Sequence, residues 1–342
     1  MRLTSCWGCQ IGGWTLLRQN WTFRRLVTHD QCLASLPCWL VLNQRKSTMV
    51  RIHFSKPLPE CKGPRLAPFK NRKFNIDFVR LLSDNEQDGH SHVFEVSIKG
   101  NAYALKISDC CVRLCLSCWQ DSQFKFYNVN EAVSLLSQAE KANLSIGVVR
   151  ALSDPFYNEC RAYGRLIDSK VNGTVAARCY GHLAVSADQE AYLRERFGVS
   201  EWDRSHKDAL VPVSKRQPFR AILKDLIPDT APLSNKLLNK MQRDLVRMRR
   251  LGVFPRDTRL RNYRGGLLVD MSIAITVPHY LFEVGSVRNT VYLLREDMLR
   301  FQAIRDESGI QSWDRTTRNM EYCKKLRGCP YGKPRRHRSI KK

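Results

Sequence analysis

The stretch FPRDTRLRNYRGGLLVD, residues 254 to 270, sets three polar side chains at short intervals around a pair of glycines. Asn262 follows Asp257 by five residues, and Asp270 follows Asn262 by eight. Carboxylate and amide oxygens bind hard cations such as Mg²⁺, and a further carboxylate nearby can accept a hydroxyl proton. These residues are therefore either loop decoration or one half of a phosphate-handling site.

The glycines predict a β-hairpin, and its loop decides where the side chains point. A three-residue loop at Arg264-Gly265-Gly266 pairs Asn262 with Leu268, so that Asn262 and Asp270 share a face at ~7 to 8 Å. A two-residue turn puts them on opposite faces. With the longer loop, we expect Asn262 and Asp270 to bind Mg²⁺ and Asp257, on the preceding loop, to act as the catalytic base.

The spacing D-x-x-x-x-N, followed by an Asp after a short hairpin, is typical of the catalytic and metal loops of the protein-kinase fold. That fold also needs a strand lysine and a helical glutamate, which pair and hold the phosphates of ATP. AYALKI supplies Lys106 and FYNECRAYGRL supplies Glu159. Each alone has an ordinary explanation, because surface lysines and helical glutamates usually face water. All five positions in order favour a kinase-like fold with Lys106 and Glu159 as nucleotide-binding residues.

Departures from the kinase pattern bring catalysis into question. No G-x-G-x-x-G precedes Lys106, Pro255 stands where the catalytic loop has His, and Asp270-Met271-Ser272 replaces Asp-Phe-Gly. No A-P-E segment follows. ATP and Mg²⁺ are therefore expected cofactors only if the five polar residues still bind ligands. The alternative is that these residues only hold the two lobes together.

Patterning along the chain predicts an α+β, protein-kinase-like two-lobed fold with a β-rich N-lobe and a helical C-lobe. Runs such as FVRLLSD, HVFEVSIK and AYALKIS, with a turn at Gly100-Asn101, indicate antiparallel strands. Helical spacing marks NEAVSLLSQAEKA, DPFYNECRAYGRLID and a helix after the N-cap Ser234 that ends at Gly252. The expected divisions are a poorly ordered extension (1–73), the N-lobe with insertions (74–227), a reduced C-lobe (233–320) and a basic tail (321–342).

The chain carries a formal charge of +25 over 342 residues, and the positive charge is concentrated. Residues 324–342 contain nine Lys or Arg and no acid, and residues 236–264 contain ten against two. Acidic partners are therefore expected: nucleic acid such as DNA, a phosphorylated protein or an acidic protein surface. The tail is either a solvated, disordered run or a segment that binds nucleic acid or an acidic protein or directs the chain to the nucleus. The polar face of the helix after Ser234, with Arg243, Arg247, Arg249 and Arg250, is either a solvated face or a binding face.

Cysteines and apolar runs bear on location. The thirteen cysteines follow no paired framework, which favours reduced thiols in a nuclear or cytoplasmic protein. Cys110, Cys111, Cys115 and Cys118 could barely complete a zinc site, so an insertion at 108–123 is the better explanation. The run LASLPCWLVL is too short for a membrane span, which needs ~20 residues. Residues 1–48 hold one acid, and either an extension outside the mature fold or a mitochondrial presequence explains them.

The segments HSHVFEVSIKGNAYALKI, NECRAYGRL, ARCYGHL, FRAILKDLI and GVFPRDTRLRNYRGGLLVDMSIAITVPH resemble the fungal kinetochore family described as the Fta-two subunit of the Sim-four complex. The resemblance covers about residues 74 to 280, without the insertion at 108–123. It implies a nuclear protein of the centromere-associated inner kinetochore, which contacts other kinetochore subunits and supports chromosome segregation. Two hypotheses follow: a catalytically weak or inactive kinase-like scaffold (a pseudokinase), or an active ATP-dependent phosphotransferase.

Overall fold

A computed structural model describes residues 52–53, 58, 62–70, 75–83, 91–108, 144–199, 202, 210–228, 232–284 and 287–309. The chain divides into two compact units, residues 1–46 and 47–342, and every described residue belongs to the second. Several predicted features therefore lie outside the described residues: the helix at 130–142, the cysteines at 110–118, residues 1–51 and the basic tail.

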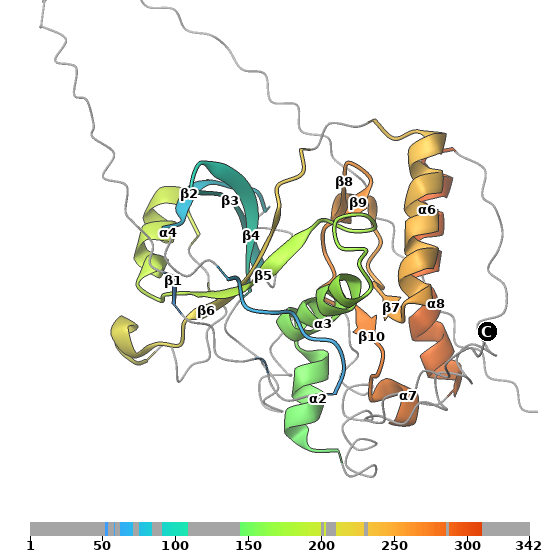
Figure 1. The fold of residues 1–342 in the computed structure, drawn as a ribbon, viewed down its shortest axis with the longest axis horizontal. Coiled ribbons are helices and arrows are strands. Elements are labelled where there is room, and N and C mark those ends of the chain that lie inside the picture. The colour runs from blue at the N-terminus through green and yellow to red at the C-terminus, as the bar shows by residue number, and fades with distance from the viewer. Residues whose placement is uncertain are drawn as a thin grey trace, which may run out of the picture. The chain divides into compact units, whose positions relative to one another are not determined.

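A six-stranded antiparallel sheet forms the N-terminal half of the described fold (Figure 1). Its spatial order is β1-β5-β6-β4-β3-β2. The strands are β1 (Ile52–His53), β2 (Asp77–Leu81), β3 (Ser91–Ile98), β4 (Asn101–Ser108), β5 (Cys179–Val185) and β6 (Phe219–Asp225). The predicted strands are present, and two described helices lie between β4 and β5.

The connection between β3 and β4 is a two-residue turn at Lys99-Gly100, where both residues have positive φ. Ile98 pairs with Asn101, so the turn lies one residue earlier than the predicted Gly100-Asn101. Positive φ at both turn residues matches the twist of the flanking strands, which explains why the tight turn is adopted.

One face of the sheet is an apolar core of its own, built by alternate residues of the strands. Phe78, Phe94, Leu105 and Phe219 are all at most 1% exposed. Helix α4 (Gln189–Phe197), which the sequence patterning missed, covers this face with Leu193 and Phe197. The opposite face carries Lys106 and Lys224 and is turned toward α3 (Pro155–Asp168).

Helix α3 follows α2 (Ile146–Ser153) and begins at the N-cap Asp154, whose side chain accepts from the amide of Phe156 at 2.9 Å. Arg220 of β6 donates to the other oxygen of Asp154 at 2.8 Å and lies over the rings of Phe156 and Tyr157. The sheet therefore holds the first turn of α3, which fixes the position of every later side chain on that helix.

The helical half of the fold opens with α6 (Asn235–Arg250), which confirms the predicted helix. Ser234 caps it by accepting from the amide of Leu237 at 3.2 Å. The buried side consists of Leu238, Met241, Leu245 and Met248. Gly252 has φ of +79°, the left-handed conformation in which helices commonly end.

After α6 come short elements and one long helix. They are β7 (Val253–Phe254), the 3₁₀ turn η2 (Leu260–Asn262), β8 (Tyr263–Arg264), β9 (Leu267–Leu268), β10 (Ile275–Thr276), α7 (Leu281–Val284) and α8 (Val287–Glu307). Another 3₁₀ turn, η1 (Val213–Lys215), lies earlier, before β6. The sequence patterning did not identify α8 as a helix. Within the described ranges, no helix is long and apolar enough to cross a membrane.

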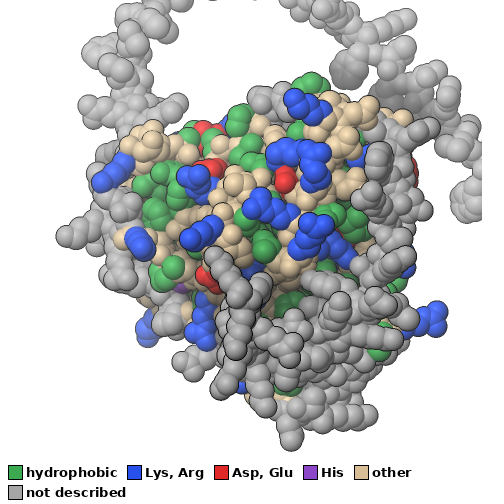
Figure 2. Space-filling view, turned by 45° about the vertical axis from the view of Figure 1, so that its right-hand side comes forward, with side chains coloured by type: hydrophobic (Ala, Val, Ile, Leu, Met, Phe, Trp, Pro, Cys, Tyr) green, Lys and Arg blue, Asp and Glu red, His purple; other side chains and the backbone are tan. Residues whose placement is uncertain are grey.

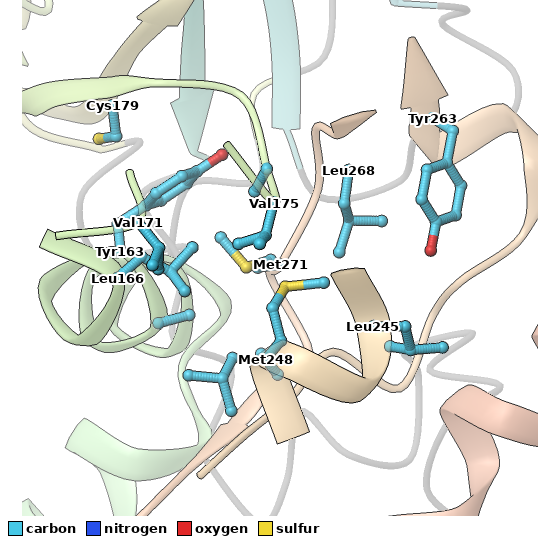
Figure 3. Close-up of a cluster of buried hydrophobic side chains, with 14 of the residues drawn as sticks. Tyr163, Leu166, Val171, Val175, Cys179, Leu245, Met248, Tyr263, Leu268 and Met271 are labelled. Atoms are coloured by element: carbon cyan, nitrogen blue, oxygen red, sulfur yellow. The ribbon is translucent and has the colours of Figure 1, made fainter. Parts of the chain in front are cut away.

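A second apolar core joins α3, α6 and the β8–β9 hairpin. In Figure 3, Met271 lies beside Met248 of α6, between that helix and the α3 side chains Tyr163 and Leu166. Met271 stands where the kinase pattern has Phe, and it is 1% exposed. The residue after Asp270 thus anchors the candidate site in the core.

The described fold is α+β, with a β-rich half and a helical half, as the sequence predicts. The expected extension at 1–73 is too long, because residues 62–70 belong to the folded part. Leu66 is 3% exposed, and the amide of Phe69 donates to the carbonyl of His182 in β5 at 2.8 Å. Segment 62–70 lacks the alternating pattern that would have marked it as a strand.

Candidate functional site

Lys106 and Glu159 form the ion pair that the sequence predicts. Lys106 lies in β4 and Glu159 in α3, and the Lys106 Nζ to Glu159 Oε2 distance is 3.0 Å. Both side chains are buried, with exposed fractions of 4% and 1%. The pair therefore links the sheet to α3 through two buried side chains.

A second lysine, which the sequence reasoning missed, joins the same glutamate. Lys224 of β6 lies 2.8 Å from Glu159 Oε1 and donates to the carbonyl of Val269 at 2.6 Å. Lys106 pairs with Ile222 of β6, so these two side chains lie on the same face of the sheet. Lys224 follows Ile222 by two residues in the same strand and therefore lies on that face as well. The alternation Arg220-x-Ile222-x-Lys224 was the available signal, because two cations share the strand face that meets α3.

Asp270 completes this group from the helical half. Its Oδ1 atom accepts from Lys106 Nζ at 2.8 Å and from the amide of Ser272 at 2.8 Å. Its side chain is 33% exposed. Ser272, which replaces the glycine of the kinase pattern, thus contributes its backbone N–H to holding the Asp270 carboxylate.

We call Lys106, Glu159, Lys224 and Asp270 the closed cluster, because two ammonium groups and two carboxylates satisfy each other. Burial disfavours the charge on Lys106, but Asp270 and then Glu159 outweigh it and raise the pKa of Lys106 above its ordinary value. Burial likewise acts to raise the pKa of Asp270, yet Lys106 and Lys224 lower it below its usual range. The raised pKa of Lys106 and the lowered pKa of Asp270 both favour the charged forms, so these two groups stabilise each other as an ion pair.

Asp257 lies in a separate group, on the loop of residues 255–262, which we call the Asp257 loop. Its two carboxylate oxygens accept from Arg259, with Oδ1 to Nε at 2.6 Å, and Arg300 of α8 lies 3.3 Å from the same Oδ1. Arg300 also pairs with Glu296 at 2.6 Å. Two guanidinium groups thus hold the expected catalytic base.

The preceding residue, Arg256, has φ of +66°, a backbone conformation that non-glycine residues rarely adopt. Its side chain is buried and pairs with Glu296 at 2.7 Å. Thr258 is also buried and donates to the carbonyl of Asp297. These contacts tie the Asp257 loop to α8, a helix absent from the sequence-based prediction.

Asn262 acts within the Asp257 loop. Its side-chain amide donates to the carbonyl of Asp257 at 3.0 Å, and its own carbonyl accepts from the amide of Val269 at 2.8 Å. The predicted three-residue hairpin loop is wrong. Tyr263 pairs with Leu268 and Arg264 with Leu267, which leaves a two-residue turn.

The two turn residues, Gly265 and Gly266, have φ of +55° and +74°, as the tight turn requires. The same-face argument for Asn262 and Asp270 therefore fails. Each instead has its own partners: Asn262 the Asp257 carbonyl, and Asp270 the ammonium of Lys106.

The metal-binding expectation does not fit this geometry. Lys106 Nζ and the amide of Ser272 both lie 2.8 Å from Asp270 Oδ1, so a dication at that oxygen would stand beside an ammonium group. Among the described residues, no group of three or more His, Cys, Asp or Glu side chains is arranged to hold a metal ion.

Two arginines of α3 fix the segment that follows Asp270. Arg161 donates to the carbonyls of Lys62 at 3.0 Å, Thr276 at 3.0 Å and Pro278 at 2.5 Å. Arg165 donates to the carbonyl of Val277 at 2.7 Å. Helix α3 is thus fastened to both the sheet and the helical half, which leaves Glu159 little freedom to move.

A family model described as "Kinetochore Sim4 complex subunit FTA2" matches residues 54–275, which include the whole closed cluster and the Asp257 loop. The chain belongs to the FTA2 family. The predicted resemblance is thereby confirmed, and the matched range begins earlier than the expected residue 74. The FTA2 match ends within β10, before α7 and α8.

Other comparisons add little to the FTA2 assignment. None of the curated proteins matches the chain. A solved structure described as "Structure of vaccinia related kinase 3" is similar over 82% of this chain and 87% of that one, with 9% identity and a TM-score of 0.27. The kinase-like reading of this FTA2-family chain rests on its own contacts, above all the pairing of Lys106 with Glu159 between strand and helix.

Proposed function

We propose that this chain is a kinase-like, non-catalytic scaffold subunit of a centromere-associated inner-kinetochore complex in the nucleus. It acts in chromosome segregation by contacting other subunits of that complex. Family membership supports the kinetochore role. The observation that carries the non-catalytic part is the closed cluster, in which every group that would touch nucleotide or metal is bonded to another protein group.

The ion pairs within the closed cluster favour a structural role over phosphate binding. A kinase-like site offers one lysine to the phosphates and one glutamate to orient it. Here Glu159 is shared by Lys106 and Lys224, and Lys106 is shared by Glu159 and Asp270. A nucleotide would have to break buried ion pairs before it gained any of its own, and breaking such pairs costs several kcal/mol.

The Asp257 loop supports the same conclusion. A general base must be free to accept a proton, whereas both oxygens of Asp257 accept hydrogen bonds from arginine. The guanidinium groups of Arg259 and Arg300 hold the carboxylate in place. Asp257 is therefore proposed to orient the loop against α8.

The alternative function is an ATP-dependent phosphotransferase. Lys106, Glu159 and Asp270, three of the five kinase-type positions, do come together, and this favours the alternative. In that case Asp257 is the base, Lys106 and Glu159 hold the nucleotide, and Asn262 and Asp270 bind Mg²⁺. Lys106 would then have to leave Asp270 when ATP and Mg²⁺ enter.

A nucleotide-binding experiment separates the two functions. We would measure melting of the full chain with and without Mg²⁺ and ATP, beside Lys106→Ala and Asp270→Asn variants, and repeat the titration calorimetrically. Ligand at a hundred times its dissociation constant adds about 2.7 kcal/mol, several degrees for a domain of this size. The scaffold predicts no shift in the folded wild type. A shift that both variants lose would overturn the non-catalytic proposal and call for phosphotransfer assays.

A genetic experiment tests the kinetochore role separately. Asp257→Asn, expressed in place of the wild type, should support normal chromosome segregation and centromere localisation, because a scaffold needs no base. A segregation defect despite normal protein level and centromere localisation would favour the enzyme. Absence of the wild-type protein from centromeres would contradict the kinetochore role itself.

The basic tail is proposed as an additional contact with DNA or an acidic protein, on the grounds of its nine cations without an acid between 324 and 342. Deletion of residues 324–342 should then weaken binding to a DNA duplex or to an acidic peptide, and do so less at high salt. Unchanged binding of both probes would remove the tail from the proposal.

A further inference from the structure

The exposed side of α6 carries a row of five cations. Lys236, Lys240, Arg243, Arg247 and Arg250 follow one another at intervals of four, three, four and three residues, so they share one side of the helix. That side is opposite the buried residues Leu238, Met241, Leu245 and Met248. Four of the five cations are exposed, and Lys240 is partly exposed.

The row is almost uniform in charge. Asp244 is the acid within α6, and it pairs with Lys240 at 2.7 Å along the helix. Arg249, which the sequence reasoning placed on the polar face, is instead buried and bonds to Asp297 and to the carbonyl of Leu294. The inward-facing arginine thus serves the fold, and the outward-facing ones form a separate set.

The β8–β9 hairpin extends this basic surface at the start of α6. A Cβ atom on Gly266 would lie 2.4 Å from the Leu237 side chain, so the turn packs against the first turn of the helix. The hairpin region adds Arg261, which is exposed, and Arg264, which is partly exposed. Figure 2 brings the α6 side of Figure 1 forward and shows Lys and Arg side chains spread over this face with few Asp or Glu among them.

We propose that this row, Lys236, Lys240, Arg243, Arg247 and Arg250, is a binding face for the phosphate backbone of duplex DNA. From residue 236 to residue 250 the helix rises ~21 Å, so the row is long enough for its cations to contact several phosphates. No aromatic or aliphatic side chain is among the exposed residues of α6, whereas protein interfaces are centred on such anchors; the exposed residues are Asn235, Lys236, Asn239, Arg243, Arg247 and Arg250. Evenly spaced flexible cations suit sequence-independent phosphate contacts.

The test uses the full chain and a fluorescein-labelled duplex of mixed sequence, with binding followed by anisotropy at several salt concentrations. Arg243→Gln, Arg247→Gln and Arg250→Gln are combined in one variant, because Gln keeps helix propensity while removing charge. We expect affinity to fall roughly tenfold at low salt and the slope of log K against log salt to decrease by about 3. Far-UV circular dichroism and melting confirm that the variant is folded.

A matched variant separates the row from total charge. Lys170→Gln, Arg194→Gln and Lys215→Gln also remove three exposed cations, but from other segments. The proposal expects this variant to bind as the wild type does. An equal loss in both variants would overturn it, since net charge would then explain binding.

Two further comparisons decide between sources of binding. Deletion of residues 324–342 measures the tail, and the row variant should weaken binding in that background as well. If DNA binding disappears with the tail and the row variant changes nothing, the row is a solvated face and the proposal fails. A polyglutamate peptide serves as an acidic-protein probe, and loss of its binding with duplex binding unchanged would also reject the proposal.

Discussion

The closed cluster and the Asp257 loop both contain residues of the kinase pattern, but they differ in how many cations meet each carboxylate and in how exposed those cations are. In the closed cluster two buried cations meet two carboxylates, and the sum is zero. Around the Asp257 loop, the three arginines 256, 259 and 300 meet Asp257 and Glu296. Arg256 is buried, but the two arginines that hold Asp257, Arg259 and Arg300, are 38% and 26% exposed, whereas Lys106 and Lys224 are each 4% exposed. Similar residue types therefore contribute differently to stability, because burial sets how strongly a charge depends on its partner.

This difference predicts that stability depends on the closed cluster and barely on the expected catalytic base. In an active enzyme the two groups would instead be linked through a shared ligand, and substitutions in either would reduce activity. Four measurements test the comparison.

The largest effect is expected for Glu159→Gln. The substitution leaves two buried lysines, one of which, Lys224, loses its carboxylate partner. The free energy of unfolding should fall by about 3 to 5 kcal/mol, measured by urea denaturation. Glu195→Gln on α4, where the side chain is exposed, is the control and should change stability by less than ~0.5 kcal/mol. Equal small effects at both sites would show that the closed cluster is not architectural.

Lys224→Met should destabilise the protein by about 2 to 3 kcal/mol. Glu159 keeps Lys106, but the carbonyl of Val269 loses its ammonium donor in a buried place. Urea denaturation measures the loss. Exposed Lys170→Met is the matched control. A neutral or stabilising result would mean that Lys224 does not stabilise the fold, and would favour a kinase-type site in which Glu159 serves Lys106 alone.

Acid should weaken the fold through His279 before it affects the carboxylates. Burial, together with Arg161, lowers the pKa of His279 to about 3, and the neutral ring bonds to the Leu152 carbonyl at 2.8 Å and to the amide of Leu281 at 3.3 Å. Because the folded pKa lies below the unfolded value near 6.5, stability is complete above pH 6.5 and is lost as pH falls toward 3.

At pH 5 this loss amounts to about 2 kcal/mol from His279 alone. Asp270, whose pKa is lowered by Lys106 despite burial, contributes stability that is lost only below its unfolded pKa near 3.8. Unfolding measured at pH 7, 5 and 3 for wild type and His279→Asn separates the two windows. The variant should be weaker at pH 7 yet lose less between pH 7 and 5, and parallel curves would refute the assignment to His279.

The smallest effect is expected for Asp257→Asn. Its carboxylate is partly exposed and its ion pairs are accordingly weak, so the free energy of unfolding should change by about 1 kcal/mol or less. Arg259→Gln, which removes the partner and not the carboxylate, should have a similarly small effect. A fall of 3 kcal/mol or more in the free energy of unfolding would show that the Asp257 loop contributes to stability as strongly as the closed cluster, contrary to the proposal.

The sequence predicted the closed cluster better than the Asp257 loop. Lys106 and Glu159 lie on a strand and a helix whose periodicity fixes which side chains share a face, so their pairing could be expected. Lys224 obeys the same strand alternation and could have been found by it. Asp270 could be placed near Lys106 only through the kinase pattern, since no local rule connects residues 164 positions apart.

The misplaced features depend on tertiary contacts or on turn chemistry. Gly265-Gly266 suits a two-residue turn as well as a three-residue loop, and packing against Leu237 accompanies the tighter one. The partners of Asp257 include Arg300, on a helix that was not predicted, so its neutralisation could not be foreseen. Arg249 looked like a surface residue until the structure showed Asp297 buried beside it.

Arg161 also sets an order on synthesis of the chain. One of its three carbonyl partners, Lys62, is made 99 residues earlier, whereas Thr276 and Pro278 are added 115 and 117 residues later. Until the ribosome has added those residues, the charged guanidinium of Arg161 lacks the carbonyl acceptors of Thr276 and Pro278. A fragment that ends at residue 275, where the family match ends, would also lack the carbonyls of Thr276 and Pro278 as acceptors for Arg161. A well-behaved fragment must therefore continue beyond Pro278.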